Sequence, residues 1–501
     1  MKIFLANPPC LIPLKNHQER YFVRAGSRWP FSVIKKRNQP LEYLPFPFFL
    51  AYTAALLEKE GFSVEVLDSI ALNQTEGEFL EKIEQIEPDI ILFETSTPTI
   101  NYDYLLVKKI KKILPSILIC LTGPHVSVYY KEAFRERPEI DFIFQGEYEL
   151  AFKDLCLQLE KNRNFARIPG LVFKNNKKLV VNRPELIEDI NVLPFPARHL
   201  FPSREIAAPT VYWDGFCQYR PAIQMHATRG CPFRCNFCLW NQVMYRNGKY
   251  RVFKPQRVIR EIRECQKKYK AKEIYFDDDT FTANKKYVLR LCREIIKNKL
   301  KISWSIMGDA MVTDEEMVEA MFQAGCIGIK FGVESGNQEI LRRIGKPVNF
   351  EKLKRFTAWC AKRKIKTHAT FTFGLSGETK QTMEDTLMLA KKLDVDSVQF
   401  SITTPFPGTR YYEELNKKGL LLSKRWEDFD GAKKSVVRFE NLKNSEVELY
   451  YQRASGQWLR TKLFEPRWIW RQLFYLRRLI IGQGIRIVFQ RFKRVVELIL
   501  R

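Results

Sequence analysis

Residues 222–240, AIQMHATRGCPFRCNFCLW, join a strand signal to three closely spaced cysteines. Cys231, Cys235 and Cys238 stand at C-x3-C-x2-C spacing, and no fourth cysteine lies nearby. Thiolates select zinc or iron–sulfur clusters, and a closed site of either kind needs four ligands. Three cysteines therefore predict a 4Fe–4S cluster with one iron left open for a substrate or cofactor. A zinc site that uses His226, or cysteines without a metal role, are the alternatives.

The strand before the cysteines opens a series of six strand signals separated by helical periodicity. Six such units over residues 221–420 predict an incomplete (β/α)6 barrel. The active site of a barrel lies on the loops at the carboxyl ends of its strands, which is where the cysteines fall. The strand signals are AIQMHATRG, EIYFDDD, SWSIMGD, GIKFGVES, HATFTFGL and SVQFSITTPFP.

Residues 1–160 form an earlier series of continuous apolar runs with intervening helical stretches. This pattern predicts an α/β domain with a doubly wound, Rossmann-like parallel sheet that is covered on both faces. Ligands of such sheets bind beyond the carboxyl ends of the strands. Small or polar residues follow the predicted strands and would let a large flat ligand approach. The candidates are Thr97, Gly123, His125 and Gly146.

Three segments lie outside the two series. Residues 11–43 form a long, basic insertion after the first strand, and long loops are either functional or disordered. Residues 161–220 are interpreted as a connector with a hairpin and a Pro-rich linker. Residues 421–501 are expected to be helical and basic.

The end of the chain has the pattern of a helix that lies on a membrane surface. From residue 453 to 501 there are 12 Lys or Arg and 2 Glu, a net charge of +10. An amphipathic basic helix with aromatic neighbours favours contact with anionic lipid, and a helix packed on the protein is the alternative. The pattern rests on apolar positions 485, 488, 489, 492, 495, 496 and 499 and on Trp468, Trp470, Phe474 and Tyr475.

The bulk composition indicates the cellular compartment in which we expect the protein. The chain has 501 residues, a net charge of +26 and 11 scattered cysteines. No apolar run reaches the roughly 18 residues that span a bilayer, and the short apolar start does not resemble a signal peptide. We expect a reduced, cytoplasmic protein that is peripheral at the inner membrane surface if the basic helix binds lipid.

The cysteine motif, with Phe237 before its last cysteine, resembles the radical S-adenosylmethionine (SAM) superfamily. The resemblance implies that the open iron chelates SAM, and that one electron from the cluster cleaves SAM to a 5′-deoxyadenosyl radical. A flavodoxin or ferredoxin-like protein would donate that electron. Cys231, Cys235 and Cys238 would be the metal ligands and the catalytic centre, and Phe237 would lie beside the cofactor.

Further segments match this superfamily in order. Asp278 and Asp279 resemble groups that meet the SAM amine, and Glu334 resembles an acid that meets its polar groups. Gly374 and Gly377 lie in a segment similar to the one beside the adenine. Each acid, taken singly, is also consistent with a helix cap.

The first series resembles the cobalamin-binding domain that precedes the barrel in many radical SAM enzymes. Thr97, Gly123, His125 and Gly146 would then line the cobalamin site. The Asp-x-His-x-x-Gly motif that supplies an axial histidine in other cobalamin proteins is absent. Cobalamin would therefore bind without a histidine ligand, or the domain would have lost it.

Together, the two resemblances imply C-methylation, or radical oxidation and cyclisation, of a small hydrophobic molecule such as a lipid, isoprenoid or tetrapyrrole. The chain is similar to the group of the anaerobic magnesium-protoporphyrin monomethyl ester cyclase and the hopanoid-associated enzymes. An RNA-modifying enzyme of the methylthiotransferase type is a second interpretation, since basic charge suits phosphate. The three cysteines of the first domain, at positions 10, 120 and 156, are too far apart for its second cluster, so we do not expect nucleic acid as a partner. A cobalamin or iron–sulfur sensor without enzymatic activity is a third.

Overall fold

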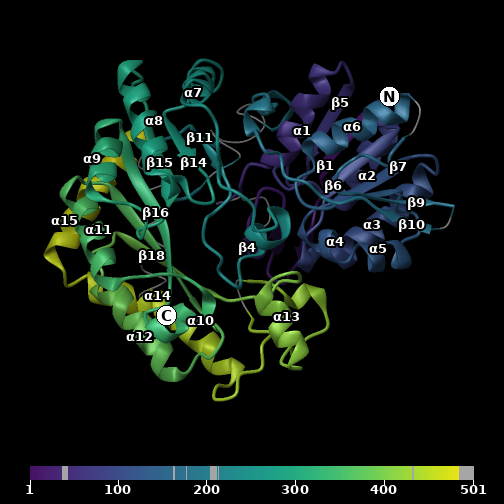
Figure 1. The fold of residues 1–501 in the computed structure, drawn as a ribbon. Coiled ribbons are helices and arrows are strands. Elements are labelled where there is room, and N and C mark those ends of the chain that lie inside the picture. Colours follow the sequence, from purple (N-terminus) through teal and green to yellow (C-terminus); the bar gives the residue numbers. More distant parts are fainter. Residues whose placement is uncertain are drawn as a thin grey trace.

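Two parallel β-sheets, one from each half of the chain, dominate the computed structural model (Figure 1). The structure describes residues 1–36, 43–161, 164–176, 178–202, 212, 214–431 and 434–483.

The first sheet contains the five strands that the sequence predicts, all parallel. Their spatial order is β5-β1-β6-β7-β8, so the chain winds outward in both directions from a switch point between β1 and β6. Alternate residues of β1 enter different cores: Leu5 packs with one set of helices and Phe4 with another. The strands are β1 (Lys2–Asn7), β5 (Ser63–Asp68), β6 (Ile90–Glu94), β7 (Leu118–Thr122) and β8 (Phe142–Phe144).

Helices cover both faces of this sheet, as the doubly wound prediction requires. Helices α1 and α6 pack against each other, and α2 packs against α3 with the other core. Local signals set the boundaries; Thr75, for example, begins α2 with a reciprocal capping box to Glu78. The helices are α1 (Phe48–Lys59), α2 (Glu76–Ile86), α3 (Ile100–Ile113), α4 (Pro124–Val128), α5 (Tyr130–Glu136) and α6 (Glu149–Glu160).

A hairpin extends the first sheet beyond its expected end. Strands β9 (Leu171–Asn175) and β10 (Lys178–Val181) form the predicted hairpin, and β9 pairs antiparallel with β8. The hairpin, expected in a separate connector, is therefore part of the first sheet. Two 3-10 turns, Ile190–Val192 and Arg198–Leu200, follow it.

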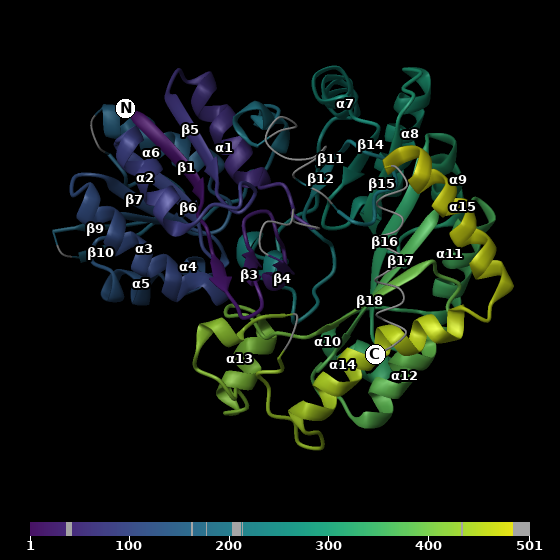
Figure 2. The same ribbon diagram turned by 180° about the vertical axis from the view of Figure 1, so that it is seen from behind.

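The insertion after β1 is a small antiparallel sheet, where the sequence suggested only a long loop. It consists of β2 (Leu11–Pro13), β3 (Gln18–Val23) and β4 (Phe31–Lys36). Strands β3 and β4 lie between the two large sheets (Figure 2). These strands are short and mix polar with apolar residues, so no periodicity marks them in the sequence.

The second sheet is the predicted open barrel. Its six strands are parallel, in sequential order, and the first and last strands do not pair with each other in the described part of the chain. They are β11 (Ala222–Met225), β14 (Glu273–Phe276), β15 (Ser303–Gly308), β16 (Cys326–Glu334), β17 (Lys366–Phe373) and β18 (Ser397–Ile402).

Helices alternate with these strands, and α8, α9, α11 and α12 cover the outer face of the sheet, whereas α13 lies apart from it, below β4 (Figure 1). The helices are α7 (Pro255–Tyr269), α8 (Lys285–Lys297), α9 (Glu315–Gln323), α10 (Gln338–Ile344), α11 (Phe350–Lys362), α12 (Lys380–Lys392) and α13 (Arg410–Lys417). Two short strands, β12 (Thr228–Arg229) and β13 (Arg251–Val252), form a separate ladder around the cysteine segment.

Two C-terminal helices, α14 (Asn444–Lys462) and α15 (Pro466–Gln483), pack on the outside of the barrel. Trp468 donates its indole N–H to the Asp396 carbonyl at 3.2 Å, and the Tyr475 hydroxyl reaches the Asp396 carboxylate at 3.3 Å. Both rings are buried, so they do not belong to a lipid-facing surface as the sequence suggested. The predicted amphipathic segment 485–499 lies outside the described residues. Within them, no helix combines the length and apolar character needed to cross a bilayer.

Candidate active site

The three cysteines lie on one loop beyond the carboxyl end of β11. Cys235 is buried, and Cys231 and Cys238 are partly exposed. Burial raises the pKa of the Cys235 and Cys238 thiols to about 12, and the neighbouring Cys231 disfavours ionisation of both. The Thr280 hydroxyl donates to Cys231 Sγ at 3.1 Å and favours its thiolate. Thiols that lie this close together in a buried loop ionise readily only when a metal cation binds them.

A single side chain holds the backbone of this loop. The Gln242 amide nitrogen donates to the carbonyls of Cys235, Asn236 and Cys238 at 2.9–3.1 Å. Its oxygen accepts from the Arg410 backbone N–H at 3.0 Å. Gln242 belongs to a π-helical turn, Trp240–Met244, which follows the cysteines directly. Such turns are frequent at functional sites.

The donor set fits an iron–sulfur cluster better than a single ion. Among the described residues, no three His, Cys, Asp or Glu side chains are gathered to hold one metal ion. In a 4Fe–4S cluster each cysteine binds a different iron, so its ligands stand further apart than those of a single ion. His226, the fourth ligand of the zinc alternative, instead stacks on Phe48 with ring centroids 3.7 Å apart.

The acids after β14 lie against the cysteine loop, where the sequence predicted them. Asp278 Oδ1 accepts the backbone N–H groups of Ala227 and Thr228 at 2.9 and 3.0 Å. Asp279 accepts the Gly230 N–H at 2.9 Å, one residue before Cys231. Burial raises the pKa of Asp278 well above its usual range, and its Oδ2 has no hydrogen-bond partner among the described residues. That unpaired oxygen is available to a ligand.

The acid after β16 has a strained backbone. Glu334 has a φ of +70°, and the β16–β17 register shifts between Gly332 and Glu334. A non-glycine residue in this region costs free energy and is frequent at functional sites. Burial raises the pKa of Glu334, which the Lys346 ammonium partly counteracts. Lys346 also binds Asp309 at 2.9 Å and favours the thiolate of Cys235, so a buried cation sits among these groups.

The two predicted glycines follow β17 and have left-handed backbones. Gly374 has a φ of +83° and Gly377 of +78°. The Gly374 carbonyl accepts from the Tyr411 hydroxyl at 2.8 Å, which ties this segment to α13. A Cβ at Gly377 would lie 1.9 Å from Arg343 Nη1, so the backbone passes close to that side chain. Both positions therefore require glycine.

The candidate cobalamin residues lie at the carboxyl edge of the first sheet. Gly123 has a φ of +102°, and a Cβ there would lie 2.3 Å from the Thr95 carbonyl oxygen. Gly146 has a φ of +73° and faces Met244 of the cysteine-bearing segment. Buried Asn7, at the end of β1, has an Oδ1 without a partner in the described part of the chain. Gly123 therefore lets the chain pass close to Thr95, and Asn7 leaves this edge one acceptor that a ligand could use.

His125 is packed against neighbouring side chains and is not open to the edge. Its Nδ1 lies 3.3 Å from Thr97 Oγ1, and its ring meets Trp426 edge-on at 5.0 Å. Burial lowers its pKa to about 3, which keeps the ring neutral. Trp426 belongs to a 3-10 turn of the C-terminal region, Trp426–Asp428, that covers this corner of the sheet.

A buried ionic network joins the two halves of the site, and the sequence did not predict it. Arg229, two residues before Cys231, contacts Glu147 at 3.1 Å and Glu149 at 2.6 Å. Arg251 reaches the other Glu147 oxygen at 2.6 Å. The side chains of Arg229, Glu147 and Glu149 are fully buried. The only signal in the sequence for this network is an arginine beside the cysteine motif and two acids after the last parallel strand of the first sheet. Arg229 and Glu147 are 82 residues apart in the chain.

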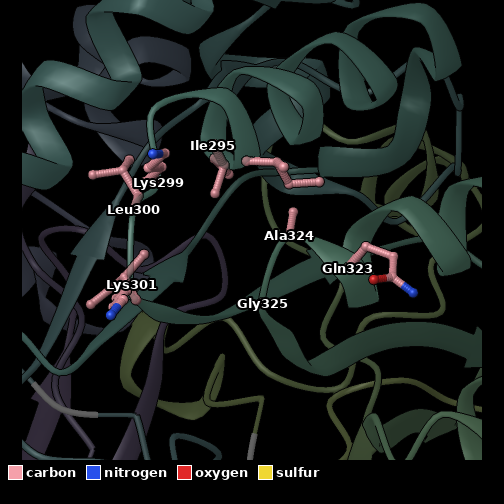
Figure 3. Close-up of a pocket in the computed structure, with 9 residues that line it drawn as sticks. Ile295, Lys299, Leu300, Lys301, Gln323, Ala324 and Gly325 are labelled. Atoms are coloured by element: carbon pink, nitrogen blue, oxygen red, sulfur yellow. The ribbon is translucent and has the colours of Figure 1, made fainter.

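Two cavities of the described structure are candidates for the binding site. One of about 310 Å³ lies where α4 of the first domain meets the segment after the cysteines, and it is lined by Ser127, Val128, Gln242, Val243, Arg246, Asn247 and Gly408. The other, of about 430 Å³, is lined by residues that precede β15 and β16 (Figure 3). It therefore lies at the amino ends of the strands, opposite the cysteines, where barrels do not place their chemistry.

Family models match both halves of the chain. The model described as "Radical SAM superfamily" matches residues 225–390. The model described as "B12 binding domain" matches residues 38–156.

Two relatives match most of the chain. A Pyrococcus horikoshii protein named uncharacterized methyltransferase PH0819 is 34% identical over 76% of this chain and 81% of its own length. The anaerobic magnesium-protoporphyrin IX monomethyl ester cyclase of Rubrivivax gelatinosus is 29% identical over 74% of this chain. The chain spans 66% of the length of that cyclase.

Solved structures share the architecture at low sequence identity. The cobalamin-dependent radical enzyme OxsB, with aqua-cobalamin and SAM bound, matches 99% of this chain and 75% of its own chain, with a TM-score of 0.67 and 15% identity. The methyltransferase TsrM of Kitasatospora setae, with cobalamin and a [4Fe-4S] cluster bound, covers 85% of this chain and 76% of its own chain, with a TM-score of 0.64 and 19% identity. These similarities concern the fold.

Proposed function

Because this chain belongs to the radical SAM enzymes that carry an N-terminal B12-binding domain, we propose that it methylates a carbon atom of a small hydrophobic substrate. The observation that carries this proposal is the 34% identity to the relative named uncharacterized methyltransferase PH0819, over 81% of its length. The similarity to the cyclase favours a second candidate, radical oxidation or ring formation on a tetrapyrrole-like substrate.

The cofactors of the enzyme are a 4Fe–4S cluster, SAM and cobalamin. When bound, they supply reductive cleavage of SAM and a transferable methyl group, and the protein binds and orients them. Cys231, Cys235 and Cys238 would hold three irons, with the loop carbonyls fixed by Gln242. The fourth iron is left without a protein ligand from this loop.

The side chains around the cysteine loop would bind SAM. Asp278 offers a buried, unpaired oxygen, Glu334 lies at the end of β16, and Lys346, which follows α10, brings a cation beside Glu334. A zwitterionic amino acid group needs both signs of charge for its amine and its carboxylate. The close backbone at Gly374 and Gly377 suits a flat adenine.

The carboxyl edge of the first sheet would bind cobalamin. Thr97, Gly123 and Gly146 surround this edge, and His125 contributes packing below it. The absence of the Asp-x-His-x-x-Gly motif agrees with a His125 ring that is held by Thr97 and Trp426. The Arg229 network fixes this edge relative to the cluster loop and excludes water from between them.

We also propose contact with a membrane surface and with a small electron-transfer protein. On the outer side of α15, Trp470 is 73% exposed, and Phe464 just before the helix is 87% exposed. Helix α15 contains four arginines and no acidic residue; Arg471 pairs with Asp394 and Asp396 of the barrel, and the positive charge of the helix suits anionic lipid. A hydrophobic substrate would reach the enzyme most readily at such a surface. Flavodoxin or a ferredoxin-like protein would supply the electron.

The test is an anaerobic reaction of reconstituted, reduced enzyme with cobalamin, methyl-labelled SAM and extracts of lipids and tetrapyrroles. Mass spectrometry should find one labelled methyl group in a product. A product that lacks the label but has lost hydrogen would support the cyclase candidate instead. An RNA substrate carrying the label would contradict the proposed substrate class.

A further inference from the structure

The insertion between β1 and α1 sends one turn into the junction between the two domains. This turn, residues 24–30, connects β3 to β4 and is called the junction turn below. A hydrogen bond from Ser27 Oγ to the Trp29 carbonyl, at 2.8 Å, closes it. Gly26, with a φ of +79°, lets it pass Phe46; a Cβ there would lie 2.5 Å from the Phe46 carbonyl oxygen. The junction turn therefore has a defined backbone conformation.

One end of the junction turn is fixed to the first domain. Arg24 forms a fully buried ion pair with Asp103 and donates to the Pro8 carbonyl at 2.7 Å. It also reaches Thr99 Oγ1 at 3.3 Å. Pro8 follows β1, and Thr99 and Asp103 follow β6. Arg24 thus sits at the switch point of the first sheet, where doubly wound domains bind their ligand.

The other end reaches the cluster loop from two sides. Arg28 donates to the carbonyl and the carboxylate of Asp277, both at 2.6 Å, and lies 3.8 Å from Asp279. Asp279 in turn accepts the Gly230 N–H. Trp29 meets Phe237, between the last two cysteines, edge-on at 6.3 Å, and Phe406 at 5.0 Å.

We propose that Arg28 and Trp29 are positioning residues that hold the cluster-binding loop in place and couple its order to the first domain. This inference rests on the proposed function, because the loop is taken to bind the cluster. Arg28 fixes the acids that orient the start of the loop, and Trp29 supports its last turn. Arg24 ties the insertion that carries them to the first sheet, so a ligand that orders the edge of that sheet would also steady the cluster-binding loop through the turn.

The test is the rate at which anaerobic, reconstituted protein loses iron to a coloured chelator, with and without aquacobalamin. Loss of a group that orients metal ligands typically weakens metal binding by about 10–100-fold. Arg28→Ala and Trp29→Ala should therefore release iron at least about tenfold faster than the wild type. Arg28→Lys keeps the charge but not the forked guanidinium, so its rate of iron release should lie between those of the wild type and Arg28→Ala. Trp29→Phe keeps an aromatic ring and should release iron almost as slowly as the wild type.

Matched controls come from exposed positions on the barrel helices. Arg290→Ala and Phe322→Ala should release iron at the wild-type rate. Aquacobalamin should slow iron release from the wild type and from both controls, but not from Arg28→Ala. A residue that only stabilises the fold would not remove this dependence on cobalamin.

Three results would overturn the inference. The first is wild-type iron release from both Arg28→Ala and Trp29→Ala. The second is an equal effect of cobalamin on wild type and Arg28→Ala. The third is a wild-type protein that takes up no cluster, which would refute the proposed function as well. If Arg28→Ala does not fold, as shown by its circular dichroism, the comparison of Arg28→Lys with wild type decides by the same criteria.

Discussion

Neutralising Glu147 tests whether the buried ionic network joins the two domains. Glu147 accepts from Arg229 at 3.1 Å and from Arg251 at 2.6 Å, and its side chain is fully buried. The change Glu147→Gln keeps the volume and removes the charge, which leaves Arg229 paired with Glu149 alone and takes from Arg251 the carboxylate that it binds. Breaking a buried pair on one side costs about 3–5 kcal/mol, because the remaining charge stays desolvated.

The assay is thermal unfolding of the cofactor-free protein, followed by tryptophan fluorescence. At about 2–4 °C per kcal/mol for a domain of this size, the midpoint should fall by about 6–20 °C. The control is Glu414→Gln on α13, whose pair with Lys418 is exposed and contributes at most about 1 kcal/mol. If Glu147→Gln lowers the midpoint no more than Glu414→Gln does, the network does not stabilise the junction and the reasoning is wrong.

Three further outcomes are expected. Burial raises the pKa of Glu94 from 4.5 to about 7, so the folded state prefers the protonated acid: the contribution of Glu94 to stability is greatest below pH 4.5 and falls by about 3 kcal/mol as the pH rises from there through 7. Glu94→Gln should abolish this fall in urea titrations from pH 4 to 8, and an unchanged pH profile would contradict the environment of Glu94. Gly61→Ala should cost about 1–2 kcal/mol for its left-handed backbone, since no atom lies within 4 Å of the added Cβ. Gly123→Ala should cost about 1–3 kcal/mol more for the clash with its neighbouring strand and should weaken cobalamin binding; equal costs for the two variants would count against that clash. Removal of iron should open Cys231 and Cys238 to a thiol reagent, with a rate that increases with pH because burial raises the pKa of both thiols, whereas the same thiols in the iron-loaded protein should stay unreactive.

The sequence predicted every parallel strand of the two sheets because each is a short apolar or alternating run, such as SVQFSI at Ser397–Ile402, with a turn at its end. It also placed the cysteine loop, since the motif follows the first strand of the second series directly. These are local signals: the residues that form the pattern are neighbours in the chain, so no knowledge of distant contacts is needed.

The parts of the site that the sequence did not predict depend on contacts between residues far apart in the chain. Arg229 and Glu147 are 82 residues apart, and Arg28 and Asp277 are 249 apart. No periodicity marks such pairs, because each side chain alone looks like an ordinary surface charge. For the same reason the sequence did not predict that Trp468 would be buried against the barrel.

The central claim is that the three-cysteine loop carries a cluster at which SAM is cleaved. The most direct measurement is the formation of 5′-deoxyadenosine by anaerobically reconstituted, reduced protein supplied with SAM. We predict about four irons per chain and steady production of 5′-deoxyadenosine in the wild type, with both lost when Cys231, Cys235 and Cys238 are all replaced by alanine. Production of 5′-deoxyadenosine by the triple variant at the wild-type rate would contradict the claim.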